Sequence, residues 1–419
     1  MTVRLESDPA GESEHGPDGV PSTGPVVREE LAAAFAALDG AGVRWLLLRG
    51  ALDGSGGDVD LLVHPADRGL VPAGLAGAGY VLRRAPEQQP HRFFVRRSVV
   101  AARWFVLDVL HVVETAGARS LTLDIVPALL DRVQRDVDGI PRLSAADAAW
   151  LAVLRAARPG AAPAGLDPLT LDGPVPSALD RVVGPGTAGE LIEAVTRAES
   201  APALAMLAAS LRRSAGRRST MRRVRDAAAL RAEGRRGVSL AVLGPDGAGK
   251  STLVDGLVQA LPFAVSVHYL GVFRTSERER LLRRVPGFAL AGKLATLRSR
   301  SLQGALDAHR GRIVLYDRHV VDALLRPGRP TFRSRVSYGL LARACPPPDL
   351  FVVLDAPGEV MFARKGEHTV EILEERRQRY LDLRERYSAL AVIDATQPAA
   401  VVLREVEDLV WALLAEPGW

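Results

Sequence analysis

One stretch of eight residues constrains this chain more than any other. Residues 244–251 read Gly-Pro-Asp-Gly-Ala-Gly-Lys-Ser and match the pattern G-x-x-x-x-G-K-[S/T]. They follow the apolar run 238–243 (VSLAVL), which predicts a buried parallel strand, and they precede helical sequence. Glycines in such a turn let backbone N–H groups surround phosphate oxygens, and the following helix adds its dipole. The sequence therefore predicts a phosphate-binding loop.

The side chains of this loop have distinct expected tasks. Lys250 is expected to neutralise the β- and γ-phosphates of ATP, and Ser251 to place its hydroxyl on Mg²⁺. ATP and Mg²⁺ are therefore the expected cofactors. The predicted cofactor-binding residues are Gly244, Gly247, Ala248, Gly249, Lys250, Ser251 and Thr252.

Apolar runs recur after the loop, at residues 264–270, 313–316, 350–354 and 390–393, with helical sequence between them. This alternation predicts a doubly wound α/β fold with a parallel sheet, in which ligands bind at the carboxyl ends of the strands. Asp317 and Arg318 follow one such strand. They are interpreted as a Mg²⁺-holding carboxylate and a phosphate-binding guanidinium, or else as a surface ion pair. Asp355 ends the next strand and is expected either to orient the site or to cap the following helix.

Residues 238 to about 415 resemble the thymidylate kinase family of P-loop kinases. The resemblance rests on GPDGAGKST, on the strand ending YDRH, and on PPPDLFVVLDAPGEVMFARKGE followed by HTVEILEERRQRYLDL. It implies that Asp246 helps to align the phosphates and that Arg318 contacts the acceptor phosphate. It also implies that Arg364 and Lys365 lie in a mobile lid that closes over ATP, excluding water and supplying cations; the alternative for both residues is a solvated helix end.

The sequence differs from the thymidylate kinase family at the positions where that family binds its acceptor. The family's Arg-Glu-Pro-Gly-Gly stretch is absent, and the second strand instead runs into His268-Tyr-Leu-Gly-Val-Phe-Arg274. His319 stands where the family has an aromatic residue after Asp-Arg. Thymidylate is therefore expected to be a poor acceptor at best. His268 and His319 are each interpreted either as substrate contacts or as structural residues.

A second motif lies near the amino terminus. Asp58 and Asp60 alternate with apolar residues, so a strand places both carboxylates on one face, where they could hold Mg²⁺. With Asp108 as a third acid, residues 28–155 resemble the nucleotidyltransferase superfold. That family has Gly-Ser in the preceding turn, whereas here Ala51 follows Gly50, and Ser55 lies in the same loop. The alternatives are a binding or inactive domain whose acids pair with arginine.

The 419 residues divide into four segments. Helical spacing is expected over 28–41, strands over 43–48, 59–63, 92–95 and 104–110, and a helix capped by Ser144. Residues 158–186, rich in Pro and Gly, are expected to form a long loop, before helical sequence from 188 to 231. The predicted segments are a disordered tail (1–25), a nucleotidyltransferase-like domain (26–155), a helical, Arg-rich connector (156–236) and a P-loop kinase domain (237–419).

Composition excludes several classes of protein. An apolar fraction of 47% excludes a largely disordered chain, and no apolar run approaches the ~18 residues of a membrane span. Cys345 is the only cysteine, which excludes disulfides and thiolate metal clusters, and no His/Cys cluster has zinc-ligand spacing. With no signal peptide visible, a cytoplasmic location is expected.

The basic charge is weak grounds for a polynucleotide partner. Only Lys250, Lys293 and Lys365 are lysines among 54 basic residues, so the excess of arginine is typical of a GC-rich coding sequence. The arginine-rich stretch 212–236 has no aromatic residue for base stacking, and it is interpreted as a solvated helix rather than as a surface for membrane or nucleic acid. A nucleic-acid partner is not expected.

Together these features predict a two-module enzyme whose carboxyl-terminal module transfers the γ-phosphoryl group of ATP. The partner would be a nucleoside monophosphate or a similar small phosphorylated or hydroxyl acceptor. Lys250 and Arg318 would stabilise charge, Asp246 would align phosphates, Asp317 would manage Mg²⁺ and Arg364 would close the lid. The alternatives are a nucleotide-binding regulatory or scaffold protein and a polynucleotide-end kinase. The oligomeric state stays open, a homodimer included.

Overall fold

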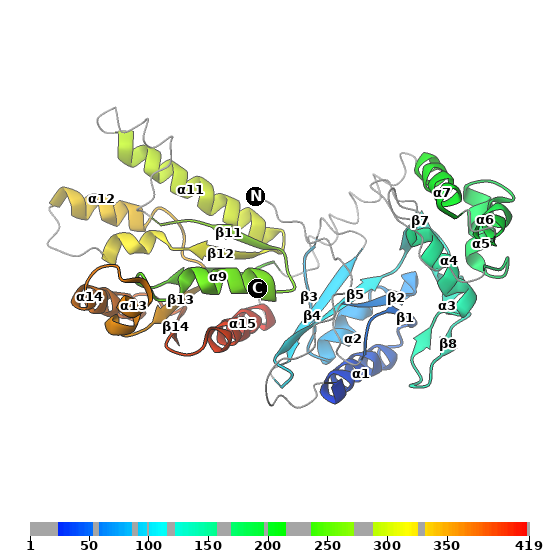
Figure 1. The fold of residues 1–419 in the computed structure, drawn as a ribbon, viewed down its shortest axis with the longest axis horizontal. Coiled ribbons are helices and arrows are strands. Elements are labelled where there is room, and N and C mark those ends of the chain that lie inside the picture. The colour runs from blue at the N-terminus through cyan, green and yellow to red at the C-terminus, as the bar shows by residue number, and fades with distance from the viewer. Residues whose placement is uncertain are drawn as a thin grey trace.

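The computed structural model describes residues 24–52, 58–85, 91–98, 100–114, 122–156, 169–196, 200–214, 236–271, 288–325 and 332–416. The chain is an α/β protein with a mixed seven-stranded sheet and an all-parallel five-stranded sheet (Figure 1). We call the described residues up to 214 the N-terminal half and those from 236 on the C-terminal half. Residues 1–23 of the predicted disordered tail and most of the arginine-rich stretch lie outside the described residues, whereas the last two residues of the predicted tail belong to the first helix, which begins at Gly24.

The seven-stranded sheet belongs to the N-terminal half and has the order β3-β4-β5-β2-β1-β9-β8. Helices α1 (Gly24–Gly40) and α2 (Val71–Gly77) contribute to one core with it, in which Leu38, Leu61 and Leu107 are fully buried. The four predicted strands are present, one with the predicted ends (59–63) and three with shifted ends. The strands are β1 (Trp45–Arg49), β2 (Val59–Val63), β3 (Val81–Leu82), β4 (Arg92–Ser98), β5 (Arg103–Leu110), β8 (Gln134–Arg135) and β9 (Pro141–Arg142).

The rest of the N-terminal half is mostly helical. Helix α4 (Ala145–Ala156) begins where predicted, because the Ser144 hydroxyl accepts a hydrogen bond from the Asp147 backbone N–H at 3.1 Å. The prediction of a long loop over 158–186 is wrong for residues 174–182, which form a helix. There, α5 (Pro174–Val182) forms with proline in its first turn, where no N–H partner is needed. The remaining elements are β6 (Val113–Glu114), β7 (Thr122–Leu123), α3 (Val126–Leu130), α6 (Thr187–Thr196) and α7 (Ser200–Ser214).

The five-stranded sheet of the C-terminal half has the order β11-β12-β10-β13-β14, and all its pairings are parallel. Each predicted strand is present. Burial on both faces explains the continuous apolar runs of the three inner strands β10, β12 and β13, whereas the edge strands β11 and β14 are only partly buried. The strands are β10 (Ser239–Leu243), β11 (Val265–His268), β12 (Ile313–Asp317), β13 (Leu350–Asp355) and β14 (Leu390–Asp394).

Helices cover both faces of this sheet, as the doubly wound prediction requires. Two of them, α9 and α15, share a core with one face, while α11, α12 and α14 bury side chains in the core on the other. The helical elements are α9 (Lys250–Ala260), α11 (Phe288–His309), η3 (Val320–Leu325), α12 (Phe332–Ala342), α13 (Gly358–Lys365), α14 (Val370–Leu381), η4 (Asp382–Glu385) and α15 (Ala399–Ala415). No helix among the described residues is long and apolar enough to cross a bilayer.

The two halves pack against each other through β3, β4 and β5, and Figure 1 shows α15 beside these strands. The indole ring of Trp104 meets Phe263 and Trp411 edge-on, with ring centroids 5.1 and 5.9 Å apart. A second contact lies at β3, where the Arg83 guanidinium donates to the Gly311 carbonyl at 2.6 Å. The N-terminal sheet therefore covers part of the C-terminal core.

Substituting Gly311 with alanine is expected to disturb this contact. Gly311 has a φ of +86°, and a Cβ there would lie 1.9 Å from the backbone oxygen of Arg84. We expect Gly311→Ala to lower the free energy of unfolding by more than the about 1–2 kcal/mol of left-handed strain alone. The control is Gly42→Ala, with a φ of +71° and open space around the added methyl group. Equal losses in urea denaturation, followed by tryptophan fluorescence, would contradict the close contact.

Candidate functional site

The phosphate-loop motif forms the turn between β10 and α9. Gly244, Gly247 and Gly249 have φ values of +143°, +88° and +96°, which side-chain-bearing residues rarely adopt. A Cβ on Gly247 would lie 2.4 Å from the Met361 backbone oxygen, so glycine is required there by space as well. Because α9 begins at Lys250, its first backbone N–H groups face the loop. The local geometry is that of an anion-binding turn.

Lys250 lies over this turn and is almost fully buried. Its Nζ donates to the carbonyl oxygens of Gly244 and Pro245, at 2.9 and 2.6 Å. The pKa of Lys250 is lowered to about 8, chiefly by burial and next by the charge of Arg318, while three nearby carboxylates oppose the shift. Ser251 and Thr252 are exposed in the first turn of α9, and Ala248 is buried beneath it.

Asp246 and Arg318 meet beside the lysine. The Arg318 guanidinium donates to Asp246 Oδ1 at 2.6 Å, and Asp246 lies 4.0 Å from Lys250 Nζ. Arg318 follows Asp317 at the carboxyl end of β12, and the charge of Asp317 acts on Lys250. The structure thus brings Lys250, Asp246, Asp317 and Arg318 together at one sheet edge, although they come from two separate segments. The surface-ion-pair alternative for Asp317 and Arg318 does not describe this arrangement.

The segment predicted to form the lid includes helix α13 and the turn after it. Arg364 donates to the Ala395 carbonyl at 2.9 Å, and exposed Lys365 pairs with Glu367 at 3.2 Å. Arg364 also lines a cavity of about 520 Å³ beside the loop. Other residues that line it are Ala248, Gly249, Thr252, Gln397 and Val402. A cavity of this size can hold a nucleoside-sized group.

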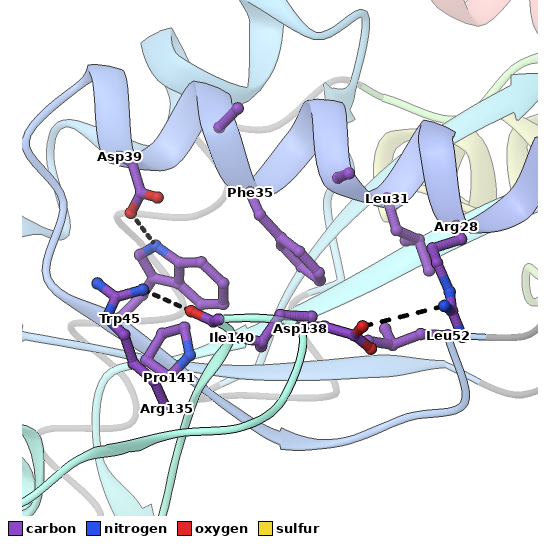
Figure 2. Close-up of a pocket in the computed structure, with 13 residues that line it drawn as sticks. Arg28, Leu31, Phe35, Asp39, Trp45, Leu52, Arg135, Asp138, Ile140 and Pro141 are labelled. Carbon is purple, nitrogen blue, oxygen red and sulfur yellow. Dashed lines mark hydrogen bonds and ion pairs between the residues drawn. The ribbon is translucent and has the colours of Figure 1, made fainter.

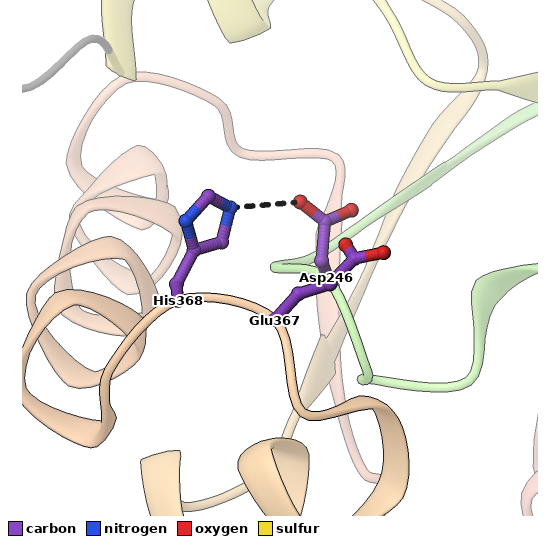
Figure 3. Close-up of side chains that lie close together, drawn as sticks. All are labelled: Asp246, Glu367 and His368. Atoms are coloured by element: carbon purple, nitrogen blue, oxygen red, sulfur yellow. Dashed lines mark ion pairs between the residues drawn. The ribbon is translucent and has the colours of Figure 1, made fainter.

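The turn after α13 also approaches Asp246. Figure 3 shows His368 and Glu367 facing Asp246, with one ligand atom from each within 4.8 Å of the others. These three residue types could hold a metal ion, but the charges around them favour ion pairs. Arg376 lies 3.4 Å from Asp246 Oδ2, in addition to Arg318 and Lys250, so cations already neutralise this carboxylate. We therefore assign no metal to this cluster.

Asp355 has a role that the motif did not reveal. Its two carboxylate oxygens accept hydrogen bonds from the Arg377 guanidinium at 2.5 and 3.0 Å. The expected cap of the following helix is wrong, because α13 begins after Pro357 without a side-chain cap. The Gly358 N–H instead donates to Glu374 at 3.0 Å. Asp355 therefore ties β13 to α14, the helix that carries Arg376.

His268 and His319, the two histidines that could contact the acceptor, both contact side chains of the protein itself. His268 Nε2 lies 3.1 Å from Asp307 on α11. His319 is 1% exposed and packs edge-on against Phe351, and burial lowers its pKa to about 4. A neutral, buried imidazole of this kind supports the structural interpretation of His319.

The N-terminal acids lie on neighbouring strands. Strands β2 and β5 are parallel, and Asp60 stands opposite Asp108 in their register. Arg49 pairs with Asp60, and His91 Nδ1 lies 2.6 Å from Asp108 Oδ2. Burial, and next the charge of Asp108, raise the pKa values of Asp58 and Asp60. Ser55 lies outside the described residues.

Each of the two buried acids keeps one carboxylate oxygen without a partner in the part of the chain that the structure describes. These atoms are Asp60 Oδ1 and Asp108 Oδ1. Asp58, Asp60 and Asp108 do not bring one oxygen each within 4.8 Å of one another among the described residues. Arg49 therefore pairs with one side of Asp60, and His91 contacts one side of Asp108, whereas the second oxygen of each carboxylate is buried without a hydrogen-bond partner among the described residues.

A second cavity, of about 400 Å³, lies between α1 and the β8–β9 hairpin. Figure 2 shows that its polar side chains are engaged with one another or with the backbone. Trp45 Nε1 donates to Asp39 at 2.8 Å, and Arg28 lies 4.0 Å from Asp138. With no converging polar atoms offered to a ligand, this cavity supports no assignment.

Several residues of both sites were not found by sequence reasoning. The motifs do not include these positions, and His91, His368, Arg376 and Tyr380 reach the sites from other elements of the fold. The residues missed are Arg49, His91, Asp322, His368, Arg376 and Tyr380.

No protein-family model and no curated protein matches this sequence. Among solved structures, the chain has a distant match to the deoxyadenosine kinase of M. mycoides with bound dATP, at 14% identity and a TM-score of 0.29. The match covers 41% of this chain and 98% of that chain. Membership of the thymidylate kinase family stays a prediction, and the side chains described above carry the argument about function.

Proposed function

We propose that the C-terminal half is an ATP-dependent phosphotransferase that acts on a nucleoside monophosphate or a similar small anionic acceptor. One observation carries this proposal: Lys250, Asp246, Asp317 and Arg318 converge beside a glycine turn at the carboxyl edge of a parallel sheet. Topology of this kind supports ligand binding at that edge. The 520 Å³ cavity next to the turn supports a site for the base and ribose of the nucleotide.

The proposed chemistry depends on positioning and charge rather than on a covalent nucleophile. Backbone N–H groups of the turn and Lys250 would bind the β- and γ-phosphates, and Arg318 would bind the acceptor phosphate. Arg364, at the wall of the cavity, would close over the nucleotide. Cations held in place before the reaction stabilise the charge that develops on the transferred group.

Ser251 and Asp317 are the residues proposed to hold Mg²⁺. A hydroxyl and a carboxylate are hard oxygen donors, and they suit this ion. When bound, Mg²⁺ neutralises charge on the phosphate oxygens. The donors belong to the same edge of the sheet as Lys250, which supports the assignment.

A screen of acceptors tests the proposal. The full-length protein is mixed with Mg-ATP and with nucleoside monophosphates (thymidylate among them), sugars or sugar phosphates, and ADP release is measured. We expect ADP release that depends on one class of acceptor, with thymidylate poor. Binding of Mg-ATP without acceptor-dependent release would instead support the regulatory or scaffold alternative. Release that depends on polynucleotide ends, with affinity falling steeply with salt, would support the end-kinase alternative.

A second proposed function concerns the N-terminal half, which we propose binds a metal–nucleotide complex through Asp58, Asp60 and Asp108. The two unpartnered buried oxygens, Asp60 Oδ1 and Asp108 Oδ1, favour it. Buried carboxylates side by side repel each other, and a divalent cation relieves that repulsion. The pairing of Asp60 with Arg49 is the competing arrangement, and the following prediction separates the two.

We expect the full-length Lys250→Ala protein, whose phosphate loop is disabled, to bind Mn²⁺ with a nucleoside triphosphate in calorimetry. Adding Asp60→Asn is expected to weaken this binding at least about tenfold, since a direct charged ligand is lost. The control is Asp67→Asn, which neutralises a buried carboxylate that pairs with Arg44 in the same half. Equal binding by the Asp60 and Asp67 variants would assign the acids to pairing with arginine instead.

A further inference from the structure

Asp322 is a buried carboxylate beside the phosphate loop that the motif does not include. It lies in η3, five residues after Asp317, and it is 2% exposed. Its Oδ1 accepts a hydrogen bond from the Tyr380 hydroxyl at 3.2 Å. Its Oδ2 has no hydrogen-bond partner within the described residues and lies 3.9 Å from Arg318 NH1.

A carboxylate at this place is costly in two ways. Burial of a charge is unfavourable unless the charge is paired, and burial raises the pKa of Asp322 to about 6 against the opposing effects of Arg318 and Lys250. A negative charge next to a phosphate site also repels the phosphate. A residue that only filled space would not need this charge.

The position of the Arg318 guanidinium is restricted by Asp322. Its backbone has a φ of +67°, in the left-handed region that side-chain-bearing residues seldom adopt. Its guanidinium lies between two carboxylates, 2.6 Å from Asp246 and 3.9 Å from Asp322. Charges on two sides restrict the guanidinium to a narrow range of positions next to the loop.

We propose that Asp322 is a positioning residue that holds the Arg318 guanidinium in the orientation that binds a substrate phosphate. This inference rests on the proposed function of the C-terminal half, because it takes Arg318 as a phosphate ligand. It adds a residue to the site that acts through Arg318 and does not touch the substrate itself.

Measuring anion binding distinguishes a positioning role of Asp322 from a purely electrostatic one. The two roles predict opposite changes in anion affinity when the carboxylate is neutralised. If Asp322 acts only by its charge, Asp322→Asn removes a repulsion and tightens the binding of an anion. If Asp322 positions Arg318, the same change weakens binding, and it does so only while Arg318 is present. Asparagine keeps the shape of the side chain and an oxygen for the Tyr380 hydroxyl.

The experiment is a double-mutant cycle on the full-length protein with tripolyphosphate as the probe, measured by calorimetry without Mg²⁺. The variants are Asp322→Asn, Arg318→Met and the two combined. The control is Asp349→Asn, which neutralises a carboxylate that pairs with Arg236 and Ser239 in the same half. If Asp322→Asn does not fold, Asp322→Ser takes its place.

We expect Asp322→Asn to weaken tripolyphosphate binding about tenfold in the parent and not in the Arg318→Met background, as for a coupled pair. Asp349→Asn should leave the affinity unchanged. Unchanged or tighter binding by Asp322→Asn, or an equal loss in both backgrounds, would overturn the proposal, as would unchanged binding by Arg318→Met. Because the readout is equilibrium binding, a failed acceptor screen would refute phosphotransfer and leave this result interpretable.

Discussion

Lys250→Ala is expected to abolish the binding of Mg-ATP by the C-terminal half while leaving the protein folded. The Nζ atom of Lys250 is the buried cation of the glycine turn, and its present partners are two backbone carbonyls that water or a rearranged turn can satisfy. At 100 times its dissociation constant, a ligand raises the free energy of unfolding by about 2.7 kcal/mol. The measurement is thermal denaturation with Mg-ATP in the Asp60→Asn background, which weakens binding by the N-terminal half. It should show this stabilisation where Lys250 is present and not where it is replaced.

The control for this prediction is Lys293→Ala, which removes a lysine of α11 by the same substitution. Equal stabilisation of the Lys250 and Lys293 variants would mean that Lys250 does not bind phosphate. A pH series adds a second check. Because the pKa of Lys250 is lowered to about 8, the lysine loses its charge as the pH rises through that value. The affinity of the parent for Mg-ATP should then fall above about pH 8, since binding must take up a proton there.

Arg97→Ala is expected to cause the largest loss of stability among the single changes considered. The Arg97 side chain is 1% exposed at the contact between the two halves, 3.2 Å from Glu407 and 2.5 Å from Asp408 on α15. Its removal leaves the buried Glu407 with one remaining hydrogen bond, from Trp104 Nε1 at 3.0 Å. Breaking a buried ion pair in this way costs about 3–5 kcal/mol of the free energy of unfolding.

Urea denaturation of the full-length protein measures this loss. The comparison is Arg310→Ala, which removes an arginine that is 49% exposed and lies 3.7 Å from Asp307. For an exposed pair we expect a loss of about 0–1 kcal/mol. The pKa of Glu407 is raised mainly by burial, so Arg97→Ala combined with Glu407→Gln should recover part of the loss. Similar losses from Arg97→Ala and Arg310→Ala would show that the contact between the halves contributes little.

Strand positions were predictable wherever a strand is buried on a sheet. The predicted run 59–63 coincides with β2, and the run 313–316 differs from β12 by one residue at its end. These runs are local patterns, since the alternation or continuity of apolar residues follows directly from which faces of a strand are covered. Helix α5 was missed because its sequence contains Pro174 and Pro176, and proline also begins helices.

The shape of the glycine turn was predictable for the same reason. This turn depends on the backbone conformations of consecutive residues, and glycine positions in the sequence determine which conformations are allowed. The placement of Asp317 and Arg318 next to the loop also followed from the sequence, because parallel strands end at the same edge of a sheet. The pairing of Asp60 with Arg49 was left open, since nothing local selects a metal or an arginine as the partner of a carboxylate.

By itself, the sequence determined the features that depend on neighbouring residues: the glycine turn with Lys250 and Ser251, the apolar strands and the Ser144 cap. The tertiary structure alone decided which distant groups complete each site. Asp322 reaches Tyr380 only because η3 packs against α14, and Arg97 reaches Glu407 only because the two halves are in contact. The physical reason is that hydrogen bonds and ion pairs act over a few ångströms in space, whereas a motif records only distance along the chain.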